Sequence, residues 1–271
     1  MATRSRSTPA GAASSGVGWL TVALLLGGVL LLYYLVPVVS LLLSAPPGAV
    51  LARLASPTVV DAATTSVLSA SISTVVATVF GVPLAYWLAR ASGPIQTAVL
   101  AVVVLPLVLP PVVGGIVLLT VVGPGSPLGA AAVDAGVPLT RSLAGVVLAQ
   151  TFVASPFVVV TAKAAFDRVD RTLEYASRSL GKSRWETARN VTIPLAGPGI
   201  VAGVTLTFAR AIGEFGATMM LAYYPRTMPV QIWVAFVELG LANAYPVAIL
   251  LVAIAAVALL VLNTVASNPW A

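Results

Sequence analysis

The chain alternates between long apolar runs and short breaks that are polar or rich in Pro and Gly. Six of the runs are long enough to cross a bilayer, which takes about 20 residues of helix. We place the six spans at Val17 to Leu43, Ala62 to Ala89, Ile95 to Val122, Ser142 to Ala162, Pro194 to Leu221 and Pro246 to Val265. The pattern predicts an all-α integral membrane protein with six transmembrane helices.

The connections between the predicted spans differ in character. Pro46 to Asp61 is expected to be a loop or a short interfacial piece, and 123–141 and 222–245 are expected to be loops on the outer side. Lys163 to Asn190 is different, because it holds half of all the charged side chains of the chain. We therefore expect this connection, between the fourth and fifth spans, to lie in water.

The ends of the chain are expected to be short tails. Residues 1–16 form the predicted cytoplasmic tail and 266–271 the C-terminal tail, which leaves 17–265 as one transmembrane domain. A signal peptide is the alternative for the first apolar run. That run, however, is well beyond the roughly 7 to 15 residues of a signal-peptide core, so we interpret it as the first span.

Composition agrees with a membrane location. The chain is 59% hydrophobic and 8% charged, with a mean hydropathy of +1.04, whereas soluble domains are about 25% charged. It contains no Cys and no His. Disulfides, thiol nucleophiles, imidazole catalysis and the usual zinc or haem ligands are therefore excluded, and no metal or cofactor is expected.

Basic residues set the expected orientation. Most of the 14 Lys and Arg residues fall in segments that share one side of a six-span topology. Basic residues concentrate on the cytoplasmic side of membrane proteins. Both termini and the segment 163–195 are therefore predicted to be cytoplasmic in a multi-pass protein of the cell membrane. The same rule explains the net charge of +6 better than nucleic-acid binding does.

The segment 163–195 contains a predicted amphipathic helix. Leu173, Ala176 and Leu180 recur at helical spacing. Glu174 and Arg178 are four residues apart, in the order that favours an ion pair along a helix. The spacing alone fits an ordinary solvated loop helix as well as a docking element.

The residues of this segment resemble the EAA motif of ABC importer permeases. The resemblance rests on Glu174-Tyr175-Ala176, Leu180-Gly181 and the sequence Val-Thr-Ile-Pro-Leu over 191–195. It departs from the family at Tyr175, where Ala is usual, and in the order of Pro and Leu at 194–195. In that family this loop is the coupling helix, which docks on a separate ATP-binding subunit. The resemblance assigns coupling to seven residues: Glu174, Tyr175, Ala176, Leu180, Gly181, Ile193 and Pro194.

Two other stretches resemble permeases for tetrahedral oxyanions. Arg210 to Thr218 contains Gly-Glu-Phe-Gly-Ala-Thr, similar to a signature of molybdate, tungstate and sulfate permeases. Leu105 to Pro111, with the glycines that follow, is similar to the molybdate and tungstate branch. The resemblance implies an importer of molybdate or tungstate, with sulfate or thiosulfate as the alternative. It also implies a homodimer that works with an ATP-binding subunit and an extracytoplasmic substrate-binding protein.

Charged residues within a span are candidates for the transport pathway. Arg210 and Glu214 would each cost about 2.5 to 3.5 kcal/mol at the centre of a helix in lipid, so we expect them to face the interior. Prolines kink a membrane helix where protein or a watery cavity covers the freed backbone groups. The predicted pathway or gate residues are Arg210, Glu214, Phe215, Thr218, Pro106 and Pro110. The alternative is that Arg210 and Glu214 form a purely structural ion pair.

Other functional classes fit the sequence less well. No phosphate-binding loop of the form Gly-x4-Gly-Lys-Ser/Thr occurs, so the chain is not expected to be an enzyme that hydrolyses ATP. An ion-coupled secondary transporter would use intramembrane acids, and Glu214 is the one acid deep in a predicted span. An intramembrane enzyme would lack the commonest bases and nucleophiles, which are His and Cys.

Overall fold

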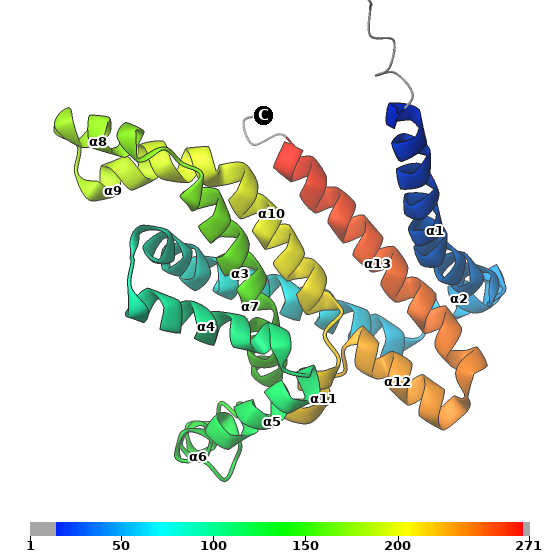
Figure 1. The fold of residues 1–271 in the computed structure, drawn as a ribbon. Coiled ribbons are helices and arrows are strands. Elements are labelled where there is room, and N and C mark those ends of the chain that lie inside the picture. Colours follow the sequence, from blue (N-terminus) through cyan, green and yellow to red (C-terminus); the bar gives the residue numbers. More distant parts are fainter. Residues whose placement is uncertain (1–14, 268–271) are drawn as a thin grey trace, which may run out of the picture. The chain divides into compact units, whose positions relative to one another are not determined.

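The structure, a computed structural model, describes residues 15–267, and every element in that part is helical (Figure 1). The chain divides after Pro46 into two compact units. The described part of the first unit is essentially one apolar helix, α1 (Ser15–Leu43). The predicted tails lie mostly outside the described residues, although 15–16 belong to α1 and 266–267 to α13. The all-α prediction is confirmed for the described part of the chain.

The second unit contains all the other described helices. Their bounds are α2 Pro47–Leu54, α3 Pro57–Arg90, α4 Pro94–Val108, α5 Pro111–Val122, α6 Pro127–Asp134, α7 Leu143–Asp167, α8 Arg171–Ser179, α9 Arg184–Thr187, the π-helical turn η1 Ala188–Thr192, α10 Ile193–Ile212, α11 Gly216–Leu221, α12 Met228–Leu239 and α13 Leu241–Ser267.

Five helical segments of the described chain are long and apolar enough to cross a membrane, and a sixth is obtained if α4 and α5 count as one span. The sequence predicts one kinked helix over 95–122, but α4 and α5 are bent by 119°. The chain is extended at Leu109 and Pro110, with ψ values of 135° and 133°. Proline lacks an N–H and drives the preceding residue out of the helical region, so two consecutive prolines break the helix.

The predicted loops contain short helices that the sequence pattern did not indicate. Segment 46–61 includes α2, 123–141 includes α6, and 222–245 includes α12 and the first turn of α13. A proline lies in the first turn of α2, α6 and α12, where its missing N–H is not needed. A bond from Met228 N to the Ser66 hydroxyl (2.7 Å) ties α12 to α3. These segments are therefore packed parts of the second unit.

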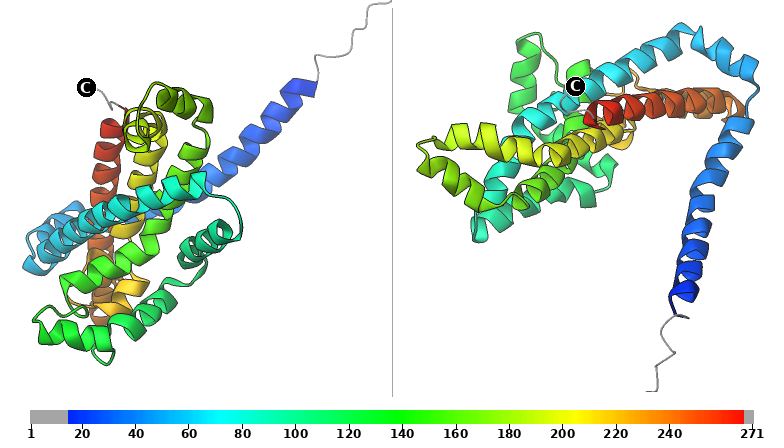
Figure 2. Two further views of the ribbon diagram at one scale, coloured as in Figure 1. Left: turned by 90° about the vertical axis from the view of Figure 1, so that its left-hand side faces the viewer. Right: turned by 90° about the horizontal axis from the view of Figure 1, so that it is seen from above.

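Helices α3, α7 and α10 form the centre of the second unit (Figures 1 and 2). Glycines permit their close approach: a Cβ on Gly81 would lie 3.0 Å from the side chains of Val158 and Val159. One on Gly203 would lie 3.1 Å from the Cα of Val158. Small residues at such contacts are typical of membrane helix pairs, which gain stability from backbone proximity. The end of α7 leads into α8, and the end of α10 leads into the break before α11. The three-helix centre therefore positions both α8 and this break.

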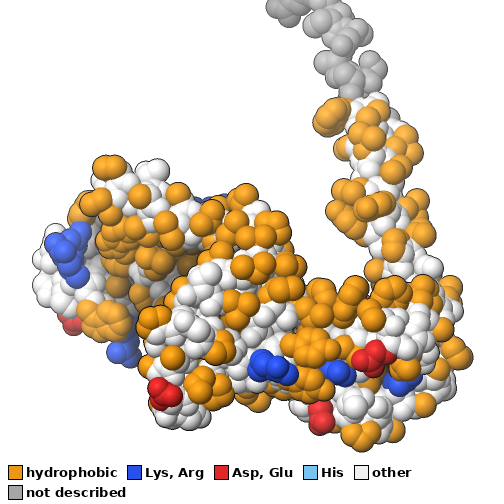
Figure 3. Space-filling view, turned by 90° about the horizontal axis from the view of Figure 1, so that it is seen from below, with side chains coloured by type: hydrophobic (Ala, Val, Ile, Leu, Met, Phe, Trp, Pro, Cys, Tyr) orange, Lys and Arg blue, Asp and Glu red, His pale blue; other side chains and the backbone are white. Residues whose placement is uncertain are grey.

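The outer surface of the second unit suits a lipid environment. In Figure 3, apolar side chains cover much of the visible face of this unit, and the charged ones gather at its left end and across its lower part. Phe80 and Val75 of α3 are 72% and 61% exposed. Large apolar side chains exposed over so wide an area would be unfavourable in water but are normal against acyl chains.

Candidate functional site

The polar segment after α7 folds as two short helices and a π-helical turn. Asp170 caps α8 by accepting a hydrogen bond from Thr172 N (2.8 Å), and this bond lowers the pKa of the Asp170 carboxyl. Ser183 and Glu186 form a reciprocal capping box at the start of α9. Gly181 joins the helices at φ 85°, a left-handed conformation that favours glycine. The predicted amphipathic helix is thus present, and its boundaries have local causes.

Glu174 is the buried side chain that ties α8 to the transmembrane helices. It is 6% exposed. Arg90, the last residue of α3, donates from Nη2 to Oε1 at 2.6 Å and from Nε to both carboxylate oxygens at 3.2 Å. Thr192 donates its hydroxyl to Oε1 at 2.8 Å, and Arg90 Nη1 donates to the Phe166 carbonyl at 3.0 Å. One carboxylate therefore joins α3, α8 and the end of η1, and Arg90 adds the end of α7.

The surroundings of Glu174 stabilise its ionised form. Burial by itself would raise the pKa of this carboxyl. Hydrogen bonds from Arg90 and Thr192, together with the positive charges of Arg90 and Arg178, outweigh burial and hold the pKa below its usual value. At neutral pH the carboxylate is therefore charged and fully engaged inside the protein.

The ion pair that the sequence spacing predicts within α8 does not form. The carboxylate of Glu174 turns inward to Arg90, while Arg178 contacts the Glu174 backbone carbonyl (Nε to O, 3.4 Å) and stacks over the ring of Tyr175 at 5.0 Å. Arg90 and Thr192 are partners of Glu174 that the sequence reasoning missed. Arg90 is 84 residues from Glu174, so spacing along a helix could not reveal it.

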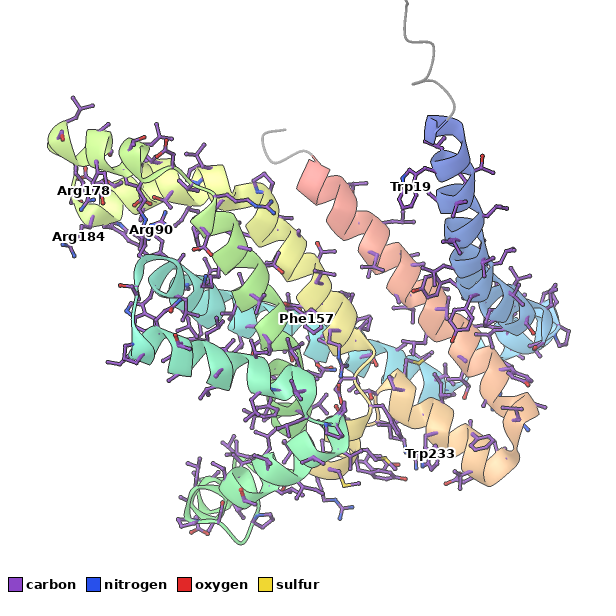
Figure 4. The ribbon with its side chains drawn as sticks, viewed as in Figure 1. Trp19, Arg90, Phe157, Arg178, Arg184 and Trp233 are labelled. Atoms are coloured by element: carbon purple, nitrogen blue, oxygen red, sulfur yellow. The ribbon has the colours of Figure 1, made fainter. Side chains whose placement is uncertain are left out.

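The other predicted coupling residues lie on or beside an exposed surface. Leu180 is 84% exposed and Tyr175 56% exposed, and Ala176 is exposed beside them. Ile193 and Pro194 form the first turn of α10, which continues directly from η1. The structure therefore brings these residues together in one projecting segment, with Glu174 alone facing inward. Figure 4 shows Arg90, Arg178 and Arg184 near one another beside α8 and α9.

The second predicted cluster lies at a helix break. The sequence predicts one span over 194–221, but α10 ends at Ile212 and α11 begins at Gly216. Glu214, in the break, is 1% exposed, and its Oε2 lies 2.6 Å from Nη1 of Arg210. Its Oε1 accepts a hydrogen bond from Ala217 N at 2.8 Å. The carboxylate thus pairs with a cation on α10 and also satisfies a free N–H in the first turn of α11.

The break beside Glu214 packs against the bend between α4 and α5. A Cβ on Gly216 would lie 3.0 Å from the Cβ of Pro111 and from the Val112 nitrogen. One on Gly115 would lie 2.8 Å from the Ala217 carbonyl oxygen. Glycine at these two positions therefore allows backbone to pack on backbone. The sequence reasoning treated both stretches as pathway candidates but did not place them against each other.

The remaining predicted pathway residues occupy different environments. The ring of Phe215 lies 5.9 Å from that of Trp233, which is labelled in Figure 4. Thr218 is fully buried, and among the described residues its hydroxyl has no hydrogen-bond partner. Pro110 precedes α5 at the bend. Pro106 instead lines a cavity of about 300 Å³ with Thr151 of α7.

Solved structures with similar folds are ABC transporters. The chain superposes with a TM-score of 0.73 on a chain of a bacterial alginate ABC transporter in complex with its alginate-bound periplasmic protein, covering 91% of this chain and 93% of that one at 16% identity. With an inward-facing methionine ABC transporter the TM-score is 0.61, over 78% and 95% of the two chains at 20% identity. These likenesses establish the fold.

Curated relatives are closer in sequence. The chain is 59% identical to a probable molybdenum ABC transporter permease protein of Haloferax volcanii, over 93% of this chain and 92% of the relative. It is 36% identical to a molybdate/tungstate transport system permease protein of Thermococcus kodakarensis, over 84% and 88%. It is 40% identical to a molybdenum transport system permease protein of Mycobacterium tuberculosis, over 75% and 78%.

The match to a protein family covers most of the second unit. Residues 81–268 match the family described as binding-protein-dependent transport system inner membrane component. This range includes the Arg90–Glu174 ion pair, which anchors α8 to α3, and the helix break at Glu214. The resemblance to ABC importer permeases that the sequence motifs carried is thereby confirmed. This chain belongs to the family of inner membrane components of binding-protein-dependent transport systems, the ABC transporter permeases.

Proposed function

We propose that this protein is the transmembrane permease subunit of an ABC importer for molybdate or tungstate. The observation that carries the proposal is the relative that is 59% identical over 93% of this chain and is named for molybdenum transport. Two more distant relatives are named for molybdate, tungstate or molybdenum as well. These names favour molybdate or tungstate over the sulfate or thiosulfate alternative.

The proposed assembly is a homodimer of this chain with two ATP-binding subunits and an external binding protein. The sequence contains no phosphate-binding loop, so ATP hydrolysis falls to a partner. The fold resembles a chain of an alginate ABC transporter solved in complex with its periplasmic protein. In this assembly 17–265 is the transmembrane domain, and α4 with α5 counts as one of six spans. The tails 1–16 and 266–271 and the segment 163–195 face the cytoplasm, as the basic residues favour.

In the proposed mechanism α8 and α9 are the coupling element that docks on the ATP-binding subunit. Leu180 and Tyr175 support this role because they expose apolar surface on a polar segment, which favours a protein contact. Glu174 holds α8 from inside the protein, and Gly181 supplies the turn between α8 and α9. Ile193 and Pro194 pass its movement to α10, since η1 and α10 form one continuous path.

The gate is proposed to lie at the two packed helix breaks. Broken helices in transporters occur where the backbone lines a cavity or a binding site. Arg210, Glu214, Phe215 and Thr218 are at one break and Pro110 at the other, and movement of α10 as a rigid body would shift both. A dianion beside Glu214 is repelled, which supports a role in gating instead of tight binding.

The test is uptake of labelled molybdate by vesicles that contain this chain, its ATP-binding subunit and its binding protein. We expect uptake that requires ATP, stops when the ATP-binding subunit is omitted, and is blocked by tungstate but not by excess sulfate. Full competition by sulfate would keep the transporter class and change the substrate. Uptake without ATP, or none with any of the three anions, would contradict the proposal.

A further inference from the structure

A cavity of about 710 Å³ lies between the α8–α9 segment and the end of α3. One wall is apolar, with Val82, Pro83 and Trp87 of α3 and Ile193 of α10. Trp87 is 42% exposed and lies one turn before the end of a candidate membrane span. Tryptophan favours the level of the lipid headgroups, so this wall reaches from the interface toward the acyl chains.

The opposite side of the cavity is cationic. Arg171, Arg178 and Arg184 line it together with Arg90, and its one acidic residue, Glu174, is already paired with Arg90. Arg171 and Arg184 therefore have no acidic partner within the cavity, and Arg178 interacts with Glu174 through its charge but forms no ion pair with it. Arg171 donates one bond from Nη2 to the Ala89 carbonyl at 3.2 Å.

Two of these arginines have donors free for a ligand. The guanidinium of Arg184 makes no hydrogen bond or ion pair with any residue in the described part of the chain. Arg178 uses Nε on a backbone carbonyl and stacks on Tyr175, which leaves its terminal nitrogens unbonded within the same part of the chain. Arginine presents a planar fork of donors that matches phosphate oxygens.

We propose that this cavity binds the phosphate headgroup of an anionic phospholipid, with an acyl chain along the apolar wall of α3. The combination identifies the ligand: a soluble anion would leave the apolar wall uncovered, and a lipid without net negative charge would leave the excess positive charge of the cavity uncompensated. Basic pockets between helices at the membrane interface suit anionic lipid headgroups. The site lies beside the Arg90–Glu174 anchor, so bound lipid would hold α8 and α9 against α3.

The experiment uses Trp87 as a reporter in the complete transporter complex. Trp19, Trp185, Trp233 and Trp270 are replaced by Phe in this chain, and Trp residues in the partner subunits are likewise replaced. The complex is placed in nanodiscs that contain brominated phosphatidylglycerol or brominated phosphatidylcholine. Bromine quenches tryptophan at short range, so the quenching ratio of the two lipids reports selectivity at the cavity.

We expect brominated phosphatidylglycerol to quench Trp87 more strongly than phosphatidylcholine. Each of Arg178→Gln and Arg184→Gln should lower the relative affinity about fivefold, the effect of one cation near a membrane surface. Arg189→Gln is the matched control, because Arg189 is exposed, lies on the same polar segment and does not line the cavity. It should keep the wild-type ratio, and gel filtration checks that each variant assembles.

Three results would overturn the proposal. Equal quenching by the two lipids would mean that the cavity does not select a negative headgroup. Selectivity abolished by inorganic phosphate, but not by chloride at the same ionic strength, would identify a soluble anion as the ligand. Selectivity seen for the isolated chain but absent in the complete complex would mean that the ATP-binding subunit occupies the cavity. None of these outcomes bears on molybdate uptake, which is tested separately.

Discussion

Arg90 at the end of α3 and Glu174 in α8 are joined by three hydrogen bonds, the shortest 2.6 Å, although 84 residues separate them in sequence. Both side chains are largely buried, at 16% and 8% exposed. Removing one member of a buried ion pair leaves the other charge buried without a partner. This destabilises a fold more than replacing both residues by apolar ones does.

The first prediction concerns this anchor. Glu174→Ala should destabilise the attachment of α8 by about 3 kcal/mol, because Arg90 is left unpaired. Hydrogen exchange of residues 171–192 in the purified chain is expected to accelerate, while exchange in α7 and α13 stays unchanged. Glu238→Ala is the control, since Glu238 is an exposed acid on α12, outside the segment 171–192. Protection of 171–192 that is equal in the two variants would contradict the anchoring role.

The second prediction is a pH dependence of the same anchor. The folded pKa of Glu174 lies below its usual value near 4.5. Its stabilisation is therefore complete above that usual value and is lost as the pH falls through the lower folded pKa. We expect the difference in hydrogen-exchange protection between the wild type and Glu174→Gln to be constant from pH 7 to about 5 and to shrink below pH 4.5. A difference that grows as the pH falls would have the wrong sign.

The third prediction concerns the turn between α8 and α9. Gly181 has φ 85°, and a Cβ there would meet nothing within 4 Å, so conformation and not space requires glycine. Gly181→Ala should destabilise the turn by about 1 kcal/mol, while Gly181→Asn should be milder because Asn adopts left-handed backbone more readily. Affinity for the ATP-binding subunit, measured with purified components, is expected to follow the order Gly, Asn, Ala. Ala and Asn variants with equal affinity would show that the backbone is not limiting.

The fourth prediction separates a gate from a structural ion pair at Arg210 and Glu214. Glu214→Gln keeps an oxygen that can accept from Ala217 N but removes the charge that pairs with Arg210. The single variants Glu214→Gln and Arg210→Gln should each lower thermal stability, and the double variant should lower it by less than their sum. If the pair takes part in gating, ATP-driven uptake stays impaired in the double variant. Recovery of uptake together with stability would assign the pair a structural role.

The fifth prediction concerns the contact between the two helix breaks. Gly115→Ala would place a Cβ 2.7 Å from Met220 Cβ and 2.8 Å from the Ala217 carbonyl oxygen. Overpacking of this kind destabilises by about 1 to 3 kcal/mol, which thermal unfolding of the purified chain would detect as a lower midpoint. Gly125→Ala is the matched control, because a Cβ at Gly125 meets nothing within 4 Å. Similar midpoints for the two variants would mean that the α5–α11 contact yields easily.

The sequence was sufficient where the signal was local. Long apolar runs predicted the helices that can span a membrane, and the spacing of Leu173, Ala176 and Leu180 predicted α8. Motif resemblance around Glu174 and Glu214 led to the family that the comparison with known proteins confirms. These features depend on neighbours within a few turns, which sequence spacing reports directly.

Features that depend on distant residues could not be predicted. The partner of Glu174 is on another helix, so the favourable spacing to Arg178 indicated the wrong ion pair. The breaks at Pro110 and Glu214 lie inside apolar runs of adequate length, and the 119° bend reflects what α5 packs against as well as its prolines. Short helices in the connections had too few residues for a periodic signal.

Helix α3 is longer than a membrane is thick. Its 34 residues extend about 50 Å at 1.5 Å per residue, whereas the hydrocarbon layer is about 30 Å deep. The helix remains continuous through Pro83 up to Arg90. A helix of this length must tilt within the bilayer or extend beyond the acyl chains, and its Arg90 end holds Glu174. A change in the tilt of α3 would therefore carry α8 sideways together with Arg90.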